Sequence, residues 1–221
     1  MAAANRLSVA KTYKIYIDGK FRNAVVAARK AQPGWARASA YLRGQILYRI
    51  AEMLEGRIEQ FVAELQLQGR TERQARKEVE IAVDRLIYYA GWADKYQQVF
   101  SSVNPVSSAH FNFSVLEPTG VVSIIAPDDS GLIGLVSYIA PAIVGGNTCV
   151  ALASESLPLS AVSFAEVLHA SDVPAGVVNI LTGFRDELTE QFASHMDVNA
   201  IAWPGDGRKM ARSVQTLAAE N

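Results

Sequence analysis

A chain of 221 residues, half of them hydrophobic, suits one large domain or one domain with a helical appendage. Its 21 Lys and Arg nearly balance 22 Asp and Glu, so we expect no nucleic-acid partner and no anionic membrane partner. The single cysteine excludes an internal disulfide, the first residues do not resemble a signal peptide, and the longest apolar stretch is too short to span a bilayer, which together favour a soluble cytoplasmic protein.

The first half of the chain has the pattern of one short strand followed by helices. Residues 13–17 alternate between apolar and polar side chains and meet Asp18-Gly19, a tight-turn pair, which predicts a strand. Apolar residues then recur every three or four positions over residues 42–65, which predicts a long helical segment that Gly69 ends. A similar pattern over residues 79–93 predicts a second helix, and core packing explains both apolar stripes.

From residue 117 onward, strands alternate with helices. Apolar runs typical of buried parallel strands occupy residues 120–125, 148–152, 177–181 and 200–203. Helical patterns lie between them, over residues 132–144, 159–170 and 186–194. The alternation predicts right-handed βαβ units, and therefore an α/β fold with a Rossmann-like parallel sheet and flanking helices. We divide the chain into an N-terminal strand-and-helix region, 1–116, and a Rossmann-like domain, 117–221.

The carboxyl ends of the strands are the expected place for chemistry, because ligands of parallel sheets bind there. After the first strand, Asp128, Asp129 and Ser130 stand where a helix would begin. We favour helix capping over a carboxylate pair for acid–base chemistry, because no base or metal ligand is near in the sequence. After the second strand, Glu155 either accepts a hydrogen bond from a ribose hydroxyl or lies in the first turn of the next helix, and its position leaves both open.

The other strand ends carry weaker signals. Gly183, after the third strand, suits a tight turn. Residues 204–208, after the fourth, resemble a phosphate loop in their two glycines, but Asp206 would repel a pyrophosphate there. Cys149 lies inside a strand among apolar neighbours, which indicates a buried, inert thiol. The three histidines lack metal-ligand spacing, so no metal site is predicted.

A series of segments along the chain occurs in the same order in one known family. In the first half these segments are residues 16–21, 27–31, 35, 43–47 and 89–95. In the second half they are residues 117–122, 125–127, 140–148, 158–161 and 173–183. On these segments nearly the whole chain resembles the front, NAD-binding half of the aldehyde dehydrogenases. The resemblance implies a domain of the dinucleotide-binding type at residues 117–221, with NAD or NADP as the cofactor.

Several departures from the family pattern fall on cofactor and catalytic positions. The family's Pro-Trp-Asn element, whose Asn helps to stabilise the thioester oxyanion, corresponds to Pro127-Asp128-Asp129. An ionised Asp129 accepts hydrogen bonds but cannot donate one to an oxyanion. The family's Lys-Pro-Ser-Glu element, whose Lys and Glu hold the adenosine ribose, corresponds to residues 152–155. There Glu155 is retained and Leu152 replaces the Lys.

Further departures follow along the chain. The family has a longer β-rich stretch where residues 21–23 here lead directly into the first helical segment. The family's general-base Glu and nucleophilic Cys correspond to positions beyond Asn221, so the resemblance implies that this chain alone cannot complete a hydride-transfer site. The other replacements are Arg185 and Thr189 for two glycines, Asp206 for the pyrophosphate serine, and Met210 for a later glycine.

These departures make the chain most similar to the degenerate second repeat of the tandem-domain aldehyde dehydrogenases. We expect a degenerate, non-catalytic domain with a scaffolding or assembly role and no catalytic residue. Vestigial cofactor contacts would fall on Pro127, Ser154, Glu155 and Gly205, and no cofactor is expected to bind tightly. One alternative is a fragment of an active NAD(P)-dependent aldehyde dehydrogenase. The other is a nucleotide-binding module without chemistry.

The expected partner is a second copy of the chain. Surfaces that the family buries against its catalytic half would be exposed here, and large exposed apolar patches are rare on monomers. The edge of the strand at residues 13–17 adds an unpaired edge. We therefore expect a homodimer in preference to docking onto a separate catalytic half.

Overall fold

The computed structural model describes residues 21–205 and 208–220. The strand expected at residues 13–17 and the residue Asp206 lie outside the described residues. The helices are α1 (Phe21–Arg37), α2 (Ala40–Glu55), α3 (Ile58–Leu67), α4 (Glu72–Ala90), α5 (Tyr96–Phe100), α6 (Ile133–Val144), α7 (Leu159–Ala170), α8 (Arg185–Ser194) and α9 (Arg208–Ala219). The strands are β1 (Ser102–Asn104), β2 (Asn112–Ser114), β3 (Val121–Ile125), β4 (Thr148–Leu152), β5 (Val178–Leu181) and β6 (Ala200–Ala202).

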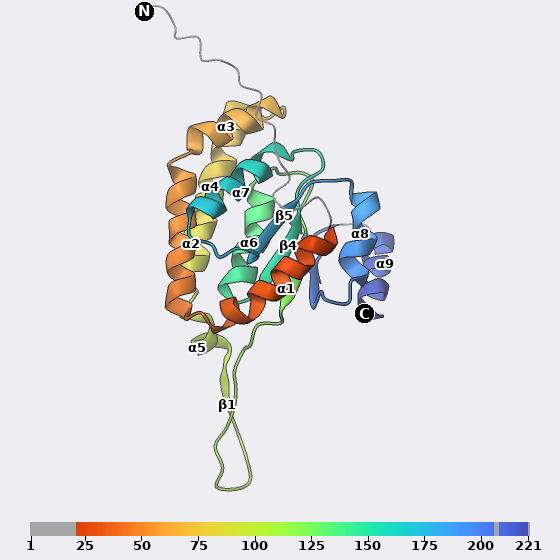
Figure 1. The fold of residues 1–221 in the computed structure, drawn as a ribbon. Helices are drawn as coiled ribbons and strands as arrows, with labels where there is room; N and C mark the ends of the chain where they lie inside the picture. Colours follow the sequence, from red (N-terminus) through yellow and green to blue (C-terminus); the bar gives the residue numbers. More distant parts are fainter. Residues whose placement is uncertain (1–20, 206–207, 221) are drawn as a thin grey trace, which may run out of the picture.

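The central sheet is parallel, with the strand order β5-β4-β3-β6 (Figure 1). Val121 pairs with Thr148, Cys149 with Val178, and Val122 with Ala200. Helices α6, α7 and α8 each connect one strand of this sheet to the next, and α9 follows β6. The α/β fold with a parallel sheet and flanking helices is therefore confirmed, and the four predicted strands match the observed ones to within one residue at each end.

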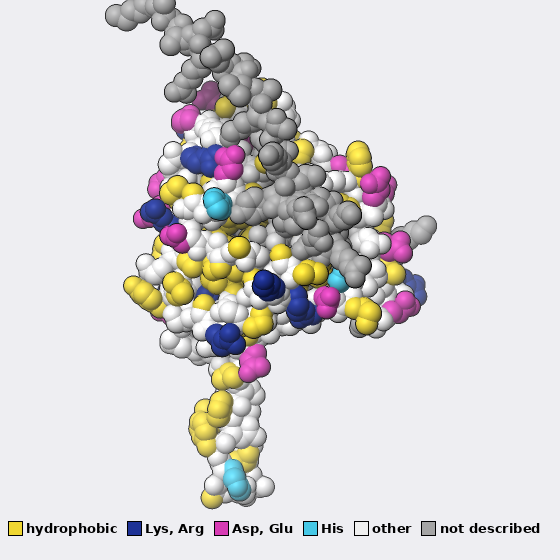
Figure 2. Space-filling model, in the orientation of Figure 1, with side chains coloured by type: hydrophobic (Ala, Val, Ile, Leu, Met, Phe, Trp, Pro, Cys, Tyr) yellow, Lys and Arg dark blue, Asp and Glu magenta, His cyan; other side chains and the backbone are white. Residues whose placement is uncertain are grey.

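A hairpin made of β1 and β2 projects from the body of the molecule and was not predicted from the sequence (Figure 1). Its strands are antiparallel, with Val103 opposite Phe113 and Asn104 opposite Asn112. We call residues 101–116 the arm. Figure 2 shows hydrophobic side chains gathered along it, and the exposed ones are Val103, Val106, Phe111, Phe113, Val115 and Leu116.

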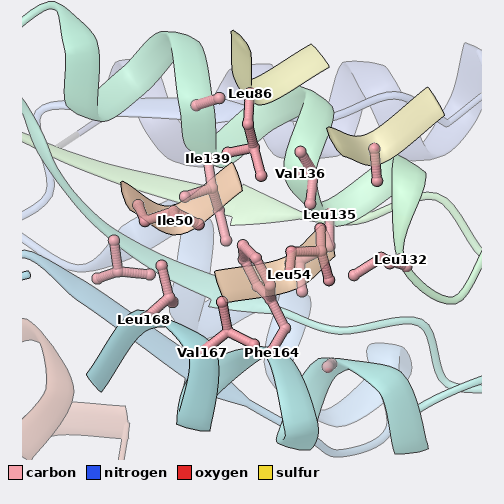
Figure 3. Packing of buried hydrophobic residues seen from close by; sticks show 14 of the residues in the cluster. Ile50, Leu54, Leu86, Leu132, Leu135, Val136, Ile139, Phe164, Val167 and Leu168 are labelled. Carbon is pink, nitrogen blue, oxygen red and sulfur yellow. The ribbon is translucent and has the colours of Figure 1, made fainter. Parts of the chain in front are cut away.

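Helices cover both faces of the central sheet, and alternate strand residues face each layer. Val121, Ile125 and Val150 pack with α1 and with Phe192 of α8. Ile124, Cys149 and Ala151 belong to the larger core, which contains residues of α2, α3, α4, α6 and α7. Figure 3 shows Ile50, Leu54, Leu86, Ile139 and Phe164 meeting in this larger core. Residues from both halves of the chain thus share one hydrophobic core.

The long helical segment expected at residues 42–65 is in fact two helices. Helix α2 ends at Glu55, where the Gly56 N–H donates to the Glu52 carbonyl, and α3 begins at Ile58 after Arg57 leaves the helical conformation. Glycine has a low helix propensity, so it favours this break. The apolar spacing continues across the break because both helices pack on α4. Gly69, with φ of +92°, ends α3 as expected.

A buried arginine joins the two halves of the chain. Arg43 of α2 donates from Nε to the Val144 carbonyl at the end of α6, at 2.8 Å. Its guanidinium also donates to the Ala38 carbonyl at 2.5 Å. A buried guanidinium is costly unless it is hydrogen-bonded, and these carbonyls meet that requirement. No helix in the described part of the chain is long and apolar enough to cross a membrane.

The core assignment predicts the effect of truncating Phe164, which is completely buried. Phe164→Ala should lower the free energy of unfolding by about 3–5 kcal/mol, because it removes apolar contacts and leaves a cavity. Urea denaturation followed by circular dichroism measures the change. Phe184→Ala, at an exposed ring, is the control and should change it by no more than about 0.5 kcal/mol. Equal losses in the two variants would contradict the assignment.

Candidate functional site

The loops after β3, β4 and β5 lie side by side at one edge of the sheet. Ile125 pairs with Leu152, and Leu152 pairs with Leu181, so the three strands end level with one another. We call residues 126–130, 153–157 and 182–185 the strand-end surface. The polar residues singled out after β3 and β4 are brought together here, at the edge where parallel sheets bind ligands.

Asp128 is the main hydrogen-bond acceptor of the strand-end surface. The Ser154 hydroxyl donates to Asp128 Oδ1 at 2.8 Å, and the Ser156 N–H donates to the same oxygen at 3.0 Å. The Ser156 hydroxyl donates to Oδ2 at 2.7 Å. The guanidinium of Arg185 lies 3.7 Å from Oδ1. These contacts tie the loop after β3 to the loop after β4.

The surroundings of Asp128 favour its ionised form. Partial burial is the largest single influence on its pKa and raises it. The hydrogen bonds from the Ser156 N–H, the Ser156 hydroxyl and the Ser154 hydroxyl, together with the charge of Arg185, outweigh burial and lower the pKa to about 2. Asp128 is therefore a fixed negative charge at neutral pH and has no proton to give to a substrate.

Helix α6 is capped by residues other than the predicted aspartates. The Ser130 hydroxyl accepts from the Gly134 N–H at 3.0 Å, which confirms capping for Ser130. Glu78 of α4 accepts from the N–H groups of Leu132 and Ile133, at 2.8 and 3.2 Å. The capping predicted for Asp128 is wrong, because its carboxylate faces the β4 loop. Glu78 was missed because no local sequence signal relates it to a helix that begins more than fifty residues later.

The side chain of Glu155, from the loop after β4, contacts the N-terminal end of α8. Its Oε2 accepts from the Arg185 N–H at 3.0 Å. Of the two alternatives left open for Glu155, the first turn of the next helix along the chain is wrong, because α7 begins only at Leu159. A carboxylate at a helix N-terminus is favoured by the free N–H groups and by the helix dipole. Glu155 therefore already serves as the anion for α8.

The side chain of Arg185 crosses the strand-end surface. Arg185 follows β5, yet its Nη2 donates to the carbonyl of Ala126, directly after β3. Strand β4 lies between β5 and β3, so the side chain passes the end of β4. Its Nε is buried and has no hydrogen-bond partner. This side chain occupies a position that a glycine, as the resemblance implied, would leave open.

The starts of α6, α7 and α8 all have acceptors from this chain. Glu78 serves α6 and Glu155 serves α8, while Gln68 Oε1 accepts from the Leu159 N–H of α7 at 3.0 Å. Backbone N–H groups at helix N-terminal ends are the usual binding groups for phosphate. Here these donors are bonded to side chains, two of which carry a negative charge.

The other residues at expected cofactor positions make contacts within the chain. Ser154 donates to Asp128 and accepts from the Leu157 N–H at 3.0 Å. Leu152, which replaces the family's Lys, is completely buried in the core that α1 covers. Gly205 lies directly against the ring of Trp203, where a Cβ atom would collide with the indole.

A cavity of about 470 Å³ lies beside the strand-end surface, between α4 and α6. Pro127 and Asp129 both line it, together with Arg70 and Lys77. Asp129 is exposed, and its backbone carbonyl, rather than its carboxylate, accepts a hydrogen bond from Arg70. The other residues that line the cavity are Gln74, Glu78, Ile81, Ser130, Ile133, Gly134, Ser137 and Tyr138.

Cys149 is completely buried inside β4. Burial raises the pKa of its thiol to about 12, so the thiolate that nucleophilic chemistry needs is not formed at neutral pH. Residues 24–205 and 210–220, whose side chains are described, contain no group of three or more His, Cys, Asp or Glu side chains that could hold a metal ion.

Comparisons with known proteins agree with this geometry. The model of the aldehyde dehydrogenase family matches residues 8–221. Hydroxyisobutyraldehyde dehydrogenase from Mycolicibacterium austroafricanum is 37% identical over 193 residues, which are 86% of this chain and 38% of that protein. Omega-crystallin from Enteroctopus dofleini is 30% identical over 210 residues, which are 94% of this chain and 41% of that protein. The chain thus spans less than half the length of these relatives.

Solved structures give the same result. An aldehyde dehydrogenase from Bacillus cereus in complex with NAD+ superposes with a TM-score of 0.84 and 28% identity, over 90% of this chain and 40% of that chain. A point mutant of betaine aldehyde dehydrogenase from Staphylococcus aureus, also with NAD+, superposes with a TM-score of 0.84 and 26% identity, over 90% and 40%. The backbone that supports the strand-end surface is therefore similar to that of NAD+-bound proteins.

The lowered pKa of Asp128 predicts a pH-dependent contribution to stability. Its ordinary value is 3.8 and its folded value about 2, so the ionised carboxylate favours the folded state. The contribution should be complete above about pH 4 and be lost as the pH falls towards 2. Because 39% of the side chain is exposed, solvent screening reduces it to about 1 kcal/mol.

The free energy of unfolding of Asp128→Asn, compared with the unchanged protein across this pH range, measures the contribution. The matched control is Asp129→Asn, at the exposed neighbouring carboxylate, which should have little effect at any pH. A difference for Asp128→Asn that persists undiminished in strong acid would show that the charge is not its cause.

Proposed function

This chain belongs to the aldehyde dehydrogenase family, and from that premise we propose that it is a non-catalytic member whose nucleotide-binding-type domain serves in assembly. The observation that carries the proposal is the exposed apolar arm. The hydrophobic side chains of the arm lie in water rather than in the core. A two-stranded hairpin is at best marginally stable in water by itself, so this arm needs a partner surface.

One face of the arm concentrates its apolar side chains. Val103 lies opposite Phe113, and Phe111 shares that face because side chains two residues apart point the same way. The rings of Phe111 and Phe113 are 5.4 Å apart at their centroids. The exposed fraction of Phe111 is 74%. Because aromatic rings are among the side chains that contribute most to interfaces, this exposed ring suits a contact with a partner.

The apolar surface continues at the base of the arm. Trp92 and Phe100 stack with their centroids 6.4 Å apart, and Tyr88 lies beside Trp92. These rings line a groove of about 360 Å³, together with Leu116. Leu116 belongs to the arm and also lines the groove, so the two apolar surfaces adjoin there, and a second copy of the chain would bring the same surfaces to them. A two-fold homodimer is therefore the assembly we propose, in preference to docking onto a separate catalytic half.

The residues present do not fit tight binding of NAD or NADP. Ribose hydroxyls and a pyrophosphate need free acceptors and free backbone donors. Glu155 is engaged within the chain, as are the first N–H groups of α7 and α8 and the N–H groups of Leu132 and Ile133 at the start of α6. Asp128 also adds a negative charge at the same edge. Of the vestigial contacts at Pro127, Ser154, Glu155 and Gly205, Ser154 and Glu155 therefore hold the loops rather than a cofactor.

The absence of catalysis is proposed from Asp129. The resemblance gives this position to an Asn that donates to an oxyanion, and an ionised carboxylate has no hydrogen to donate. The buried thiol of Cys149 suits a reducing compartment such as the cytoplasm.

A second candidate function is the nucleotide-binding part of an active aldehyde dehydrogenase. It is supported by the fold shared with NAD+-bound aldehyde dehydrogenases and by the 37% identity to hydroxyisobutyraldehyde dehydrogenase. Those relatives are more than twice as long as the matched region, so their activity belongs to chains with further residues. A nucleotide-binding module without chemistry is a third candidate, and it requires a free Glu155. Turnover and nucleotide binding separate the three.

The assembly proposal predicts that charges on the arm abolish the dimer. Val103→Lys with Phe113→Lys should convert the protein from a dimer to a monomer, because two ammonium groups would have to be desolvated in the interface. Size-exclusion chromatography with light scattering measures the mass. The control is Leu67→Lys with Met196→Lys, at two exposed apolar side chains of the body, which should stay dimeric. A monomer before any substitution would contradict the proposal.

The second prediction is that the purified chain does not oxidise aldehydes. With aliphatic or aromatic aldehydes and NAD or NADP, reduced cofactor should not form above a blank without protein, because Asp129 cannot stabilise an oxyanion. Absorbance of the reduced nicotinamide measures turnover. Activity that survives purification and is lost in Asp129→Ala would favour the active-enzyme candidate instead.

A further inference from the structure

We propose that Arg185 occupies, from within the chain, the surface across which a dinucleotide would lie, and that this side chain lowers the affinity of the fold for a dinucleotide. The inference rests on the proposed function, since it explains why a domain with this fold would not bind the nucleotide. It assigns to Arg185 the role of an internal occupant rather than of a ligand-binding cation.

The guanidinium of Arg185 reaches across the strand-end surface. Arg185 begins α8, after β5, and its Nη2 reaches the Ala126 carbonyl after β3. These are the outer two of three neighbouring strands, so the side chain lies across the end of β4. A ligand that bridges the ends of β3 and β5 in a parallel sheet has to take the same path.

The charge of Arg185 is already paired within the chain. Asp128 Oδ1 lies 3.7 Å from Nη2, and the backbone N–H of Arg185 donates to Glu155 at 3.0 Å. A guanidinium held between a carbonyl and a carboxylate is not available to attract a pyrophosphate. To bind, a dinucleotide would have to break the bond to Ala126 and then lie beside the carboxylates of Asp128 and Glu155.

The side chain of Arg185 is also largely buried. Only 23% of the Arg185 side chain is exposed, although Arg185 is the first residue of α8. Its Nε is buried without a hydrogen-bond partner. A buried donor without a partner is unfavourable, so this position is maintained by the other contacts of the side chain. Removing the side chain should open the surface without removing a core residue.

The test is a calorimetric titration of the 221-residue chain with NAD and with ADP-ribose. The unchanged protein should bind both no more tightly than millimolar. Arg185→Ala should bind both about tenfold or more tightly, because the ligand no longer displaces a charge-assisted hydrogen bond. Arg185→Met is the second variant; it keeps the aliphatic stem and loses the guanidinium, and it should show a gain in the same direction.

The matched control is Arg57→Ala. The Arg57 side chain is 24% exposed and pairs with Glu166 at 2.7 Å, on the contact between α3 and α7 and away from the strand ends. The Arg57→Ala substitution should leave the affinity for ADP-ribose unchanged. The unfolding midpoint of each variant shows which of them are folded.

Three outcomes would overturn the proposal. The first is a folded Arg185→Ala or Arg185→Met protein with unchanged affinity. The second is weaker binding in those variants, which would make Arg185 a ligand contact. The third is an equal gain in Arg57→Ala. The three variants leave the arm unchanged, so light scattering reports separately on the dimer. Failure of the assembly proposal is therefore distinguishable from failure of the proposal for Arg185.

Discussion

The carboxylate of Asp128 is the interaction on which the strand-end surface depends. It follows β3 directly, and it accepts hydrogen bonds from Ser154 and Ser156 in the loop after β4. Its charge also faces Arg185, which comes from the loop after β5. A partly buried carboxylate has to be satisfied by its neighbours, and here the neighbours are the side chains that would otherwise be free for a ligand. The same edge that binds ligands in other parallel sheets is therefore closed by contacts within this chain.

Much of the fold could be predicted from the sequence because its strands are buried on both faces. Strands β3 and β4 are continuous apolar runs, and the helices between strands have clear periodicity, so the α/β alternation is a local signal. The break at Gly56 was not predicted because the apolar spacing continues through it. The arm was not predicted because its short strands face solvent and lack a buried face that would impose alternation.

The site was less predictable because its contacts join residues far apart in the sequence. The sequence predicts Asp128 and Glu155 at strand ends and Arg185 in place of a family glycine, but only the sheet order shows that the three meet. The capping of α6 by Glu78 joins two helices across more than fifty residues, and no spacing rule identifies such a pair. The core that supports this edge belongs to the fold shared with aldehyde dehydrogenases, whereas the proposed loss of nucleotide binding rests on a few side chains at the edge.

A crystal structure of this chain grown with millimolar NAD tests the central claim most directly, because it shows the strand-end surface and the cofactor together. The account predicts that Arg185 remains hydrogen-bonded to the Ala126 carbonyl, that Glu155 still accepts from the Arg185 N–H, and that no ordered dinucleotide lies across β4. Ordered NAD over the end of β4, with the Arg185 side chain displaced or bound to the pyrophosphate, would contradict it.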